Sequence, residues 1–181
     1  SEPHHTAQLQ QEARVAASVN HPNVVQILSL GTDHDQFYVV MELMDHGSLD
    51  DLMESQGCLP EQQVLDIGIQ IARGLRAAYR KHLIHRDVKP ANILFVDEQA
   101  AKIGDFGLAA FATQQSRHAE SDRVIWGTPP YVAPERLCNQ REDVRSDIYS
   151  LGATLFHAVA GKPPIESSTN SATELYALKQ H

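Results

Sequence analysis

The eight residues from His85 to Asn92, with the sequence HRDVKPAN, constrain this chain more than any other stretch. Six of the eight are polar or conformationally special. They are followed, in this order, by Asp105-Phe106-Gly107 and Ala133-Pro134-Glu135. Each triplet alone is a weak pattern, because short patterns recur by chance. All three in a fixed order make a chance match very improbable.

This ordered set resembles the catalytic half of a eukaryotic-type (Hanks-type) serine/threonine protein kinase. Lys89, two residues after Asp87, is typical of the serine/threonine branch, and the stretch 143–164 resembles bacterial members. The resemblance runs from about Glu12 to the end of the chain. It implies an α+β, protein-kinase-like fold: a partial small lobe and hinge over about residues 1–44, with one helix plus a β-hairpin, and a mostly α-helical large lobe over 45–181.

The same resemblance implies that the chain is truncated at both ends. A Gly-rich loop and a strand lysine are expected before Glu12, and neither is present. The last helices of the large lobe, with the arginine that normally pairs with Glu135, are also absent. We therefore expect an internal piece of a longer kinase, inactive on its own.

Composition excludes several other classes of protein. The chain has 181 residues and a net charge of −8, which argues against binding to nucleic acid. Cys58 and Cys138 are far apart in the sequence and are predicted to be reduced, cytoplasmic thiols. No apolar run is long enough to span a bilayer. The ten histidines include neighbours such as His4 and His5, but solvated or structural histidines are favoured over a zinc site.

Hydrophobic periodicity and turn residues predict the order of elements. A short helix over about 6–19 precedes a hairpin whose strands lie at 24–28 and 37–41. Ser48 is expected to cap a short helix through Met53. Pro60 opens the longest helix, which runs to about His82 with an apolar stripe. The remaining expectations are a hairpin at 93–96 and 101–103, a long polar segment at 105–135, a helix at 147–159 that is apolar all round and buried, and a helix beginning near Ser171.

Phosphoryl transfer from ATP requires an acceptor for the hydroxyl proton and positive charge near the phosphates. We expect Asp87 to accept the proton and Lys89 to lie beside the transferring group. Asn92 and Asp105 are the expected Mg²⁺ ligands, because hard cations favour oxygen donors. Gly107 allows a sharp turn beside the metal. As isolated residues, Asp87 and Asp105 would be ordinary turn acids; within the ordered set, that interpretation is remote.

The resemblance also assigns residues that bind the nucleotide. Glu12 matches the helix glutamate that pairs with the ATP-binding lysine. Without the resemblance, a glutamate on a short exposed helix would be interpreted as a solvated charge. Met41, Glu42 and Met44 match the hinge, where backbone groups of Glu42 and Met44 would bond adenine. Leu94 is expected to contact the nucleotide. The expected cofactors are ATP and Mg²⁺ in the full-length kinase.

A further set of residues has expected structural or regulatory roles. Phe106 matches a position that stacks with Ala16, Ile27 and His85 across the two lobes. Asp147 matches a buried helix residue that holds the loop backbone, since a buried carboxylate needs donors. Glu135 belongs to the third triplet, and Thr128 is expected near Asp87.

Regulation is expected in the long polar segment. Arg86 would contribute to a cationic pocket for a phosphorylated loop residue; the candidates are Thr113, Ser116 and Ser121, of which Ser121 is the leading one. Alternatively, the acids on either side of Ser121 supply part of that charge and keep the loop ordered without phosphate.

The predicted function is transfer of the ATP γ-phosphoryl group to protein serine and threonine hydroxyls. A kinase-like binding module without catalysis is the alternative, but the intact catalytic-loop and metal residues disfavour it. The lack of a Gly-x-x-x-x-Gly-Lys stretch argues against a P-loop protein. Expected partners are protein substrates, and self-association would allow phosphorylation in trans. The expected location is the cytoplasm, with a parent protein of the type often anchored in the inner membrane.

Overall fold

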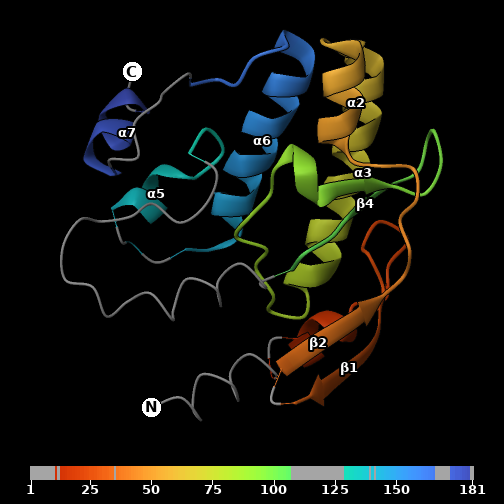
Figure 1. Cartoon of the computed structure of the whole chain (residues 1–181). Helices are drawn as coiled ribbons and strands as arrows, with labels where there is room; N and C mark the ends of the chain where they lie inside the picture. Colours follow the sequence, from red (N-terminus) through yellow and green to blue (C-terminus); the bar gives the residue numbers. More distant parts are fainter. Residues whose placement is uncertain are drawn as a thin grey trace.

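The computed structural model describes residues 11, 13–34, 36–106, 129–138, 140, 142–165 and 172–179. Two short antiparallel hairpins are combined with several helices, so the chain has the mixed α+β architecture that the sequence predicts. In Figure 1 the hairpin of β1 and β2 lies at one end of the molecule, and the longer helices stand side by side at the other.

The first part of the described chain is a helical segment followed by the β1–β2 hairpin. Residues 13–17 are helical, and the helix ends two residues earlier than predicted. Strand β1 (Ile27–Asp33) pairs antiparallel with β2 (Gln36–Met41) around the predicted turn. β1 begins three residues later than predicted. One reason is that Val24 and Val25 pair with Ile103 of the other hairpin: Val24 forms a parallel β-bridge with it, and the Val25 N–H donates to its carbonyl.

Helices α2 (Leu49–Gln56) and α3 (Glu61–Tyr79) follow. Ser48 caps α2 as predicted: its hydroxyl accepts from the Asp51 N–H, and the Asp51 carboxylate accepts from the Ser48 N–H in return. This reciprocal capping box satisfies two donors that the first turn of a helix would leave unpaired. α3 begins directly after Pro60, and its predicted stripe is buried, with the members Val64, Ile67, Ile71 and Leu75.

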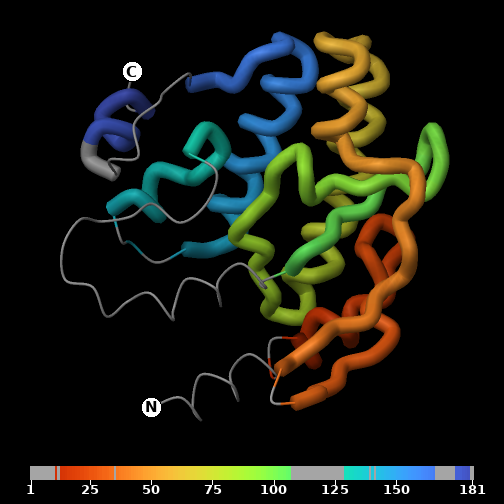
Figure 2. The backbone as a smooth tube through the Cα atoms, in the orientation of Figure 1, coloured from red at the N-terminus to blue at the C-terminus, as the bar shows by residue number. Residues whose placement is uncertain are grey.

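The second hairpin, β3 (Ile93–Phe95) and β4 (Ala101–Ile103), lies against α3. A 3₁₀ turn, η1 (Pro90–Asn92), leads into β3. The hairpin is a junction, because its ends meet both halves of the chain: Val24 bridges to Ile103, and Ser48 bridges to Leu94. Figure 2 shows how the backbone connects the two halves of the chain: it leaves β2 and runs past the β3–β4 hairpin to α2.

Two further helices, α5 (Pro134–Leu137) and α6 (Val144–Ala160), precede the last described helix, α7 (Ala172–Leu178). α6 packs beside α3 (Figure 1). The helices approach closely at Gly68, where an added Cβ would lie 2.7 Å from Leu155. α6 ends at Gly161, which adopts the left-handed conformation with φ 69° that closes a helix without a steric penalty.

The prediction that α6 is buried all round is wrong for the described structure. Ile148 is 61% exposed and Phe156 is 49% exposed, whereas Leu151 and Ala158 are buried. α6 therefore presents one apolar face to α3 and another to the surface. Composition alone cannot distinguish these two faces, because both carry the same kinds of residue. Among the described helices, none has both the length and the apolar character needed to cross a membrane.

Candidate functional site

The segment 85–92 folds so that Asp87, Lys89 and Asn92 lie together. The Lys89 Nζ is 2.9 Å from the Asp87 Oδ2. The Asn92 Nδ2 donates to the same oxygen at 3.1 Å and to the Asp87 backbone carbonyl at 2.7 Å. Pro90 at the start of η1 makes this possible, because the 3₁₀ turn folds Asn92 back over Asp87. The two contacts with the Asp87 carboxylate, from Lys89 and Asn92, both involve Oδ2, and no described residue bonds to Oδ1.

Asp147, at the start of α6, holds this segment through its backbone. Asp147 is 4% exposed. It accepts from the His85 N–H and the Arg86 N–H, each at 2.8 Å. A buried carboxylate is stable when donors satisfy its oxygens. The loop–carboxylate contact expected from the sequence is therefore present, across a separation of about 60 residues.

The ring of His85 connects the segment to the end of β4. His85 is 1% exposed. Its Nδ1 lies 3.2 Å from the Asp87 N–H, and its Nε2 lies 2.7 Å from the Gly104 carbonyl. These partners require a neutral ring with the proton on Nε2, since a backbone N–H donates and a carbonyl accepts. Burial lowers the pKa of His85, in agreement with the neutral form.

Asp105 follows directly after Gly104, at the end of β4. The Gly104 N–H donates to the Asn92 carbonyl at 2.9 Å, so the end of β4 and η1 are hydrogen-bonded neighbours. Asp105 is exposed, with φ 59°, and Arg86 has φ 69°. Left-handed backbone at residues other than glycine costs about 1–3 kcal/mol and is concentrated at functional sites. Both strained residues adjoin the His85–Gly104 contact.

Phe106 is buried, and its ring contacts the ring of His85. Its ring centroid lies 4.6 Å from that of His85, at an interplanar angle of 60°, which is the edge-to-face arrangement that aromatic rings prefer. Ala16 belongs to the same hydrophobic core as Phe106, and the partly buried Ile27 packs against that core. Of the four residues that the resemblance groups, Ala16, Ile27 and Phe106 thus share this core, which contains many other residues, and His85 contacts it through the Phe106 ring.

The segment after β2 holds the residues predicted to bind adenine. Met41 ends β2, and Met41, Glu42, Met44 and Leu94 are all half-buried. The Glu42 N–H donates to the Gln26 carbonyl at 3.0 Å. Among the described residues, none donates to the Glu42 carbonyl and none accepts from the Met44 N–H.

The side chain of Glu42 has a role that the sequence analysis missed. Its carboxylate lies 2.6 and 2.7 Å from the Lys102 Nζ and accepts from the Gln26 N–H at 2.6 Å. Burial opposes ionisation of Glu42, but these donors outweigh it and lower its pKa. This clamp joins the expected hinge to β4 and to the segment before β1. This contact could not be predicted from the sequence, because residues 42 and 102 are brought together only by the fold.

Arg86 and Arg136 both form an ion pair with Glu142. The Arg86 Nε lies 3.4 Å from Glu142, and the Arg136 Nε lies 3.2 Å from the same carboxylate. Arg136 also donates to the Arg86 backbone carbonyl. Two guanidinium groups thus contact one carboxylate in the region where a cationic pocket was expected. Arg136 and Glu142 were not predicted.

Glu135, next to Arg136, accepts from the Ser146 hydroxyl at 2.5 Å. This bond ties the third triplet to α6 one residue before Asp147. Four predicted site residues, Glu12, Gly107, Ser121 and Thr128, lie outside the described residues, as do Thr113 and Ser116.

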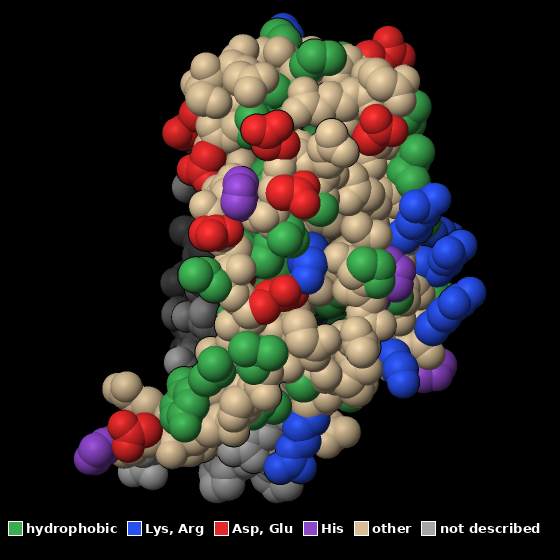
Figure 3. Space-filling view, turned by 90° about the vertical axis from the view of Figure 1, so that its right-hand side faces the viewer, with side chains coloured by type: hydrophobic (Ala, Val, Ile, Leu, Met, Phe, Trp, Pro, Cys, Tyr) green, Lys and Arg blue, Asp and Glu red, His purple; other side chains and the backbone are tan. Residues whose placement is uncertain are grey.

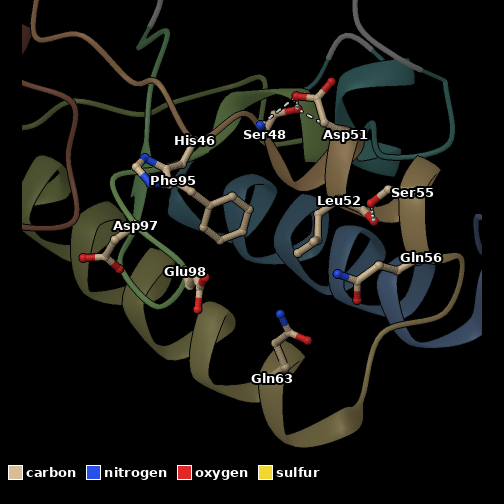
Figure 4. Close-up of a pocket in the computed structure, with 10 residues that line it drawn as sticks. All are labelled: His46, Ser48, Asp51, Leu52, Ser55, Gln56, Gln63, Phe95, Asp97 and Glu98. Atoms are coloured by element: carbon tan, nitrogen blue, oxygen red, sulfur yellow. Dashed lines mark hydrogen bonds between the residues drawn. The ribbon is translucent and has the colours of Figure 1, made fainter.

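A cavity of about 500 Å³ lies away from these residues. Figure 4 shows that Phe95 and Leu52 face each other across it, with Asp97 and Glu98 from the β3–β4 turn at one side and Gln63 of α3 at the other. None of its lining residues belongs to the predicted site. The described part of the chain holds no group of three or more His, Cys, Asp or Glu placed to bind a metal.

Comparison with known proteins agrees with this geometry. The whole chain, residues 1–181, matches the family described as the protein kinase domain. It is 36% identical to the serine/threonine-protein kinase PknB of Mycobacterium leprae over 84% of the chain. It is 35% identical to ATG1a of Arabidopsis thaliana over 90% of the chain, and 37% identical to PknL of Mycobacterium tuberculosis over 84%.

The chain spans only part of these relatives: 25% of PknB, 26% of ATG1a and 38% of PknL. Each of the three is named a serine/threonine-protein kinase. The match to the family, in contrast, extends over the full length of the chain. The chain therefore belongs to the protein kinase domain family.

Proposed function

We propose that the protein containing this chain transfers the γ-phosphoryl group of ATP to serine and threonine hydroxyls of other proteins. The observation that carries this proposal is the contact of Asp87 with both Lys89 and Asn92, on a segment fixed by Asp147. A carboxylate, a cation and an amide group are thereby brought together, and Asp105 follows Gly104, whose N–H donates to the Asn92 carbonyl. Phosphoryl transfer depends mainly on such positioning and on electrostatic stabilisation.

Asp87 is proposed to accept the proton of the attacking hydroxyl. Oδ2 is occupied by Lys89 and Asn92, so Oδ1 is the oxygen assigned to the substrate. As the hydroxyl oxygen bonds to the γ-phosphorus, its proton passes to Asp87, and the bond to the leaving ADP breaks. General-base catalysis of this kind contributes about 10²–10⁴-fold. Lys89, fixed by Asp87, places positive charge beside the transferring group.

Asn92 and Asp105 are proposed to hold Mg²⁺. The Asn92 Nδ2 is committed to Asp87, so its amide oxygen Oδ1 is directed elsewhere and is free to coordinate. Asp105 supplies an exposed carboxylate from the adjacent turn. One carboxylate and one amide oxygen fit the preference of Mg²⁺, which keeps several waters and binds substrate phosphates. When bound, the ion would neutralise charge on the phosphates.

Adenine is proposed to lie against the segment 41–44, with the Glu42 carbonyl and the Met44 N–H as its partners and Leu94 against it. The Glu42–Lys102 clamp supports this assignment, because it fixes the position of the Glu42 backbone. We likewise propose a division into a small-lobe part over about 1–44 and a large-lobe part over 45–181. Glu12 remains the proposed partner of an ATP-binding lysine.

Regulation is proposed to act through Arg86. A phosphate on Ser121 would add charge-assisted hydrogen bonds to a guanidinium group. The contact of both Arg86 and Arg136 with the Glu142 carboxylate supports a site at which two guanidinium groups lie close together. Thr128 is assigned to the neighbourhood of Asp87. Mass spectrometry of the active protein would identify the phosphorylated residue, and a fully active Arg86→Ala variant without phosphate would contradict the switch.

The family in general acts on protein substrates with ATP and a divalent metal ion. For this protein we propose a cytoplasmic kinase domain, and the free thiols Cys58 and Cys138 support a reducing compartment. Anchoring of the parent protein in the inner membrane and self-association for phosphorylation in trans are further proposals.

The test is the identity of the acceptor. The full-length protein is incubated with radiolabelled ATP, Mg²⁺ and a generic basic protein, and the labelled amino acids are separated after hydrolysis. The proposal predicts label on serine and threonine and none without Mg²⁺. Label on tyrosine alone, or ATP binding without any transfer, would replace it by another acceptor class or by a binding module.

A further inference from the structure

The far end of α3 carries a concentration of positive charge on an otherwise acidic chain. Four cations, Arg73, Arg76, Arg80 and Lys81, are exposed; together they are named here the α3 basic face. No Asp or Glu occurs between Asp66 and Asp87, although the chain as a whole has a net charge of −8. Figure 3 shows Lys and Arg side chains gathered along one edge of the molecule.

The three arginines lie on one side of the helix. At 3.6 residues per turn, Arg73, Arg76 and Arg80 fall within an arc of about 60° and span about 10 Å along the axis. No ion pair joins any of the three to a described carboxylate. Burial lowers the pKa of His21, on the neighbouring loop, and the positive charges of Arg76 and Arg73 lower it further.

Helix stability does not account for this arrangement. A cation in the last turn of a helix is favourable by about 0.3–1 kcal/mol, which explains Arg76 or Arg80. Arg73 lies too far from the end to gain from this effect. Like charges three or four residues apart are unfavourable by about 0.2–0.5 kcal/mol per pair, and Arg73–Arg76 and Arg76–Arg80 are two such pairs. A ligand that neutralises them would offset this cost.

We propose that the α3 basic face is a docking site for a phosphorylated segment of a protein. Arginines one turn apart present two planar forks to one side, a spacing suited to hold a phosphate, and guanidinium binds phosphate oxygens in bidentate fashion. The proposal goes beyond the proposed function and rests on it only because phosphorylated segments are the products of that reaction.

A broad anionic surface fits this face less well than a short segment. Gln70 donates to the Gln99 carbonyl at 2.8 Å, which places the turn carrying Asp97 and Glu98 beside α3 one turn before Arg73. Asp66 lies on the same side of the helix, two turns before Arg73. A flat anionic membrane in contact with this face would also lie close to these carboxylates. Salt screens charges only beyond about one Debye length, roughly 8 Å at physiological ionic strength, so the carboxylates would repel the membrane. A peptide would contact the arginines alone.

The experiment measures binding to the full-length protein by fluorescence anisotropy, without ATP. The probe is a short labelled peptide with two phosphoserines one helical turn apart. A second peptide carries glutamate at both positions, and vesicles of anionic phospholipid form a third arm. The expected result is saturable binding of the phosphopeptide, about tenfold tighter than the glutamate peptide because the phosphate carries more charge and more acceptors.

Variants locate the site. Arg76→Gln should weaken phosphopeptide binding about tenfold, and the triple change Arg73→Gln, Arg76→Gln, Arg80→Gln should abolish it. Arg76→Lys should fall between, because lysine keeps the charge but loses the fork. Arg14→Gln, an exposed arginine on another helical segment, is the matched control and should bind as wild type. Glutamine is a good helix former, and the single variants remain informative if the triple one is unstable.

Several results would overturn the proposal. They are absence of saturable binding, equal affinity for the glutamate peptide, tighter binding to the vesicles, or equal loss in Arg14→Gln and Arg76→Gln. Because the assay needs no catalysis, its failure and the failure of the proposed function are distinguishable.

Discussion

Asp147 offers the clearest quantitative prediction, because its contacts are few, short and buried. In Asp147→Asn, one carboxylate oxygen becomes an NH₂ group. One of the two loop N–H groups, from His85 or Arg86, then faces a donor instead of an acceptor. A buried N–H without a partner costs about 1–3 kcal/mol. The surviving bond also loses its charge assistance, which roughly halves its strength.

Together these losses amount to about 2–4 kcal/mol, a large fraction of the about 5–15 kcal/mol that stabilises a typical domain. For a domain of this size, 1 kcal/mol corresponds to about 2–4 °C in Tm, so the expected decrease is about 4–16 °C. Thermal and urea unfolding of the full-length protein, followed by fluorescence, would measure it. Phosphoryl transfer should decrease in parallel, because the segment 85–92 loses its fixed position.

Asp97→Asn is the matched control. Asp97 also accepts from two backbone N–H groups, those of Gln99 and Ala100, but it is exposed and both bonds go to one oxygen. The asparagine retains that oxygen, so the free energy of unfolding should change by less than about 0.5 kcal/mol. If Asp147→Asn is no more destabilising than Asp97→Asn, the account of how the segment is held is wrong.

Three further predictions concern the metal, the clamp and acid. Asp105→Ala should weaken ATP binding in calorimetric titrations with Mg²⁺ and change it little without Mg²⁺; unchanged Mg-ATP affinity would refute the metal role. A double-mutant cycle of Lys102→Met and Glu42→Gln should give a coupling energy of about 1–2 kcal/mol in urea unfolding, whereas additive losses would show that the clamp contributes nothing. Burial lowers the pKa of His85 below 6.5, so below pH 6.5 the unfolded chain binds a proton that the folded chain does not. The free energy of unfolding should then fall, by up to about 1.4 kcal/mol per pH unit from this residue; a His85 ring that titrates near 6.5 by NMR in the folded protein would contradict this.

Much of the fold follows from local sequence signals. The stripe of α3, the Ser48 cap and the positions of both hairpins depend on residues within a few positions of one another. Such contacts form wherever the local pattern is satisfied. The start of β1 was misplaced for the opposite reason: Val24 and Val25 have strong β character, but their partner is Ile103, far along the chain.

The candidate site divides in the same way. Residues 85–92 and 105 could be proposed from sequence because the protein kinase family carries these residue types in this order. Lys102 could not be paired with Glu42, nor Arg136 with Glu142, because each pair is made by tertiary packing of otherwise ordinary charged residues. The tautomer of His85 likewise depends on Gly104, whose carbonyl decides which ring nitrogen carries the proton.

The most direct test of the central claim is phosphoryl transfer by Asp87→Asn in the full-length protein. The account predicts that Mg-ATP still binds, since Lys89, Asn92 and Asp105 are unchanged, while the rate falls at least about 100-fold because an amide cannot accept the hydroxyl proton. Asp97→Asn should retain the wild-type rate. Near wild-type transfer by Asp87→Asn, measured with radiolabelled ATP, would contradict the assignment of Asp87 and with it the proposed mechanism.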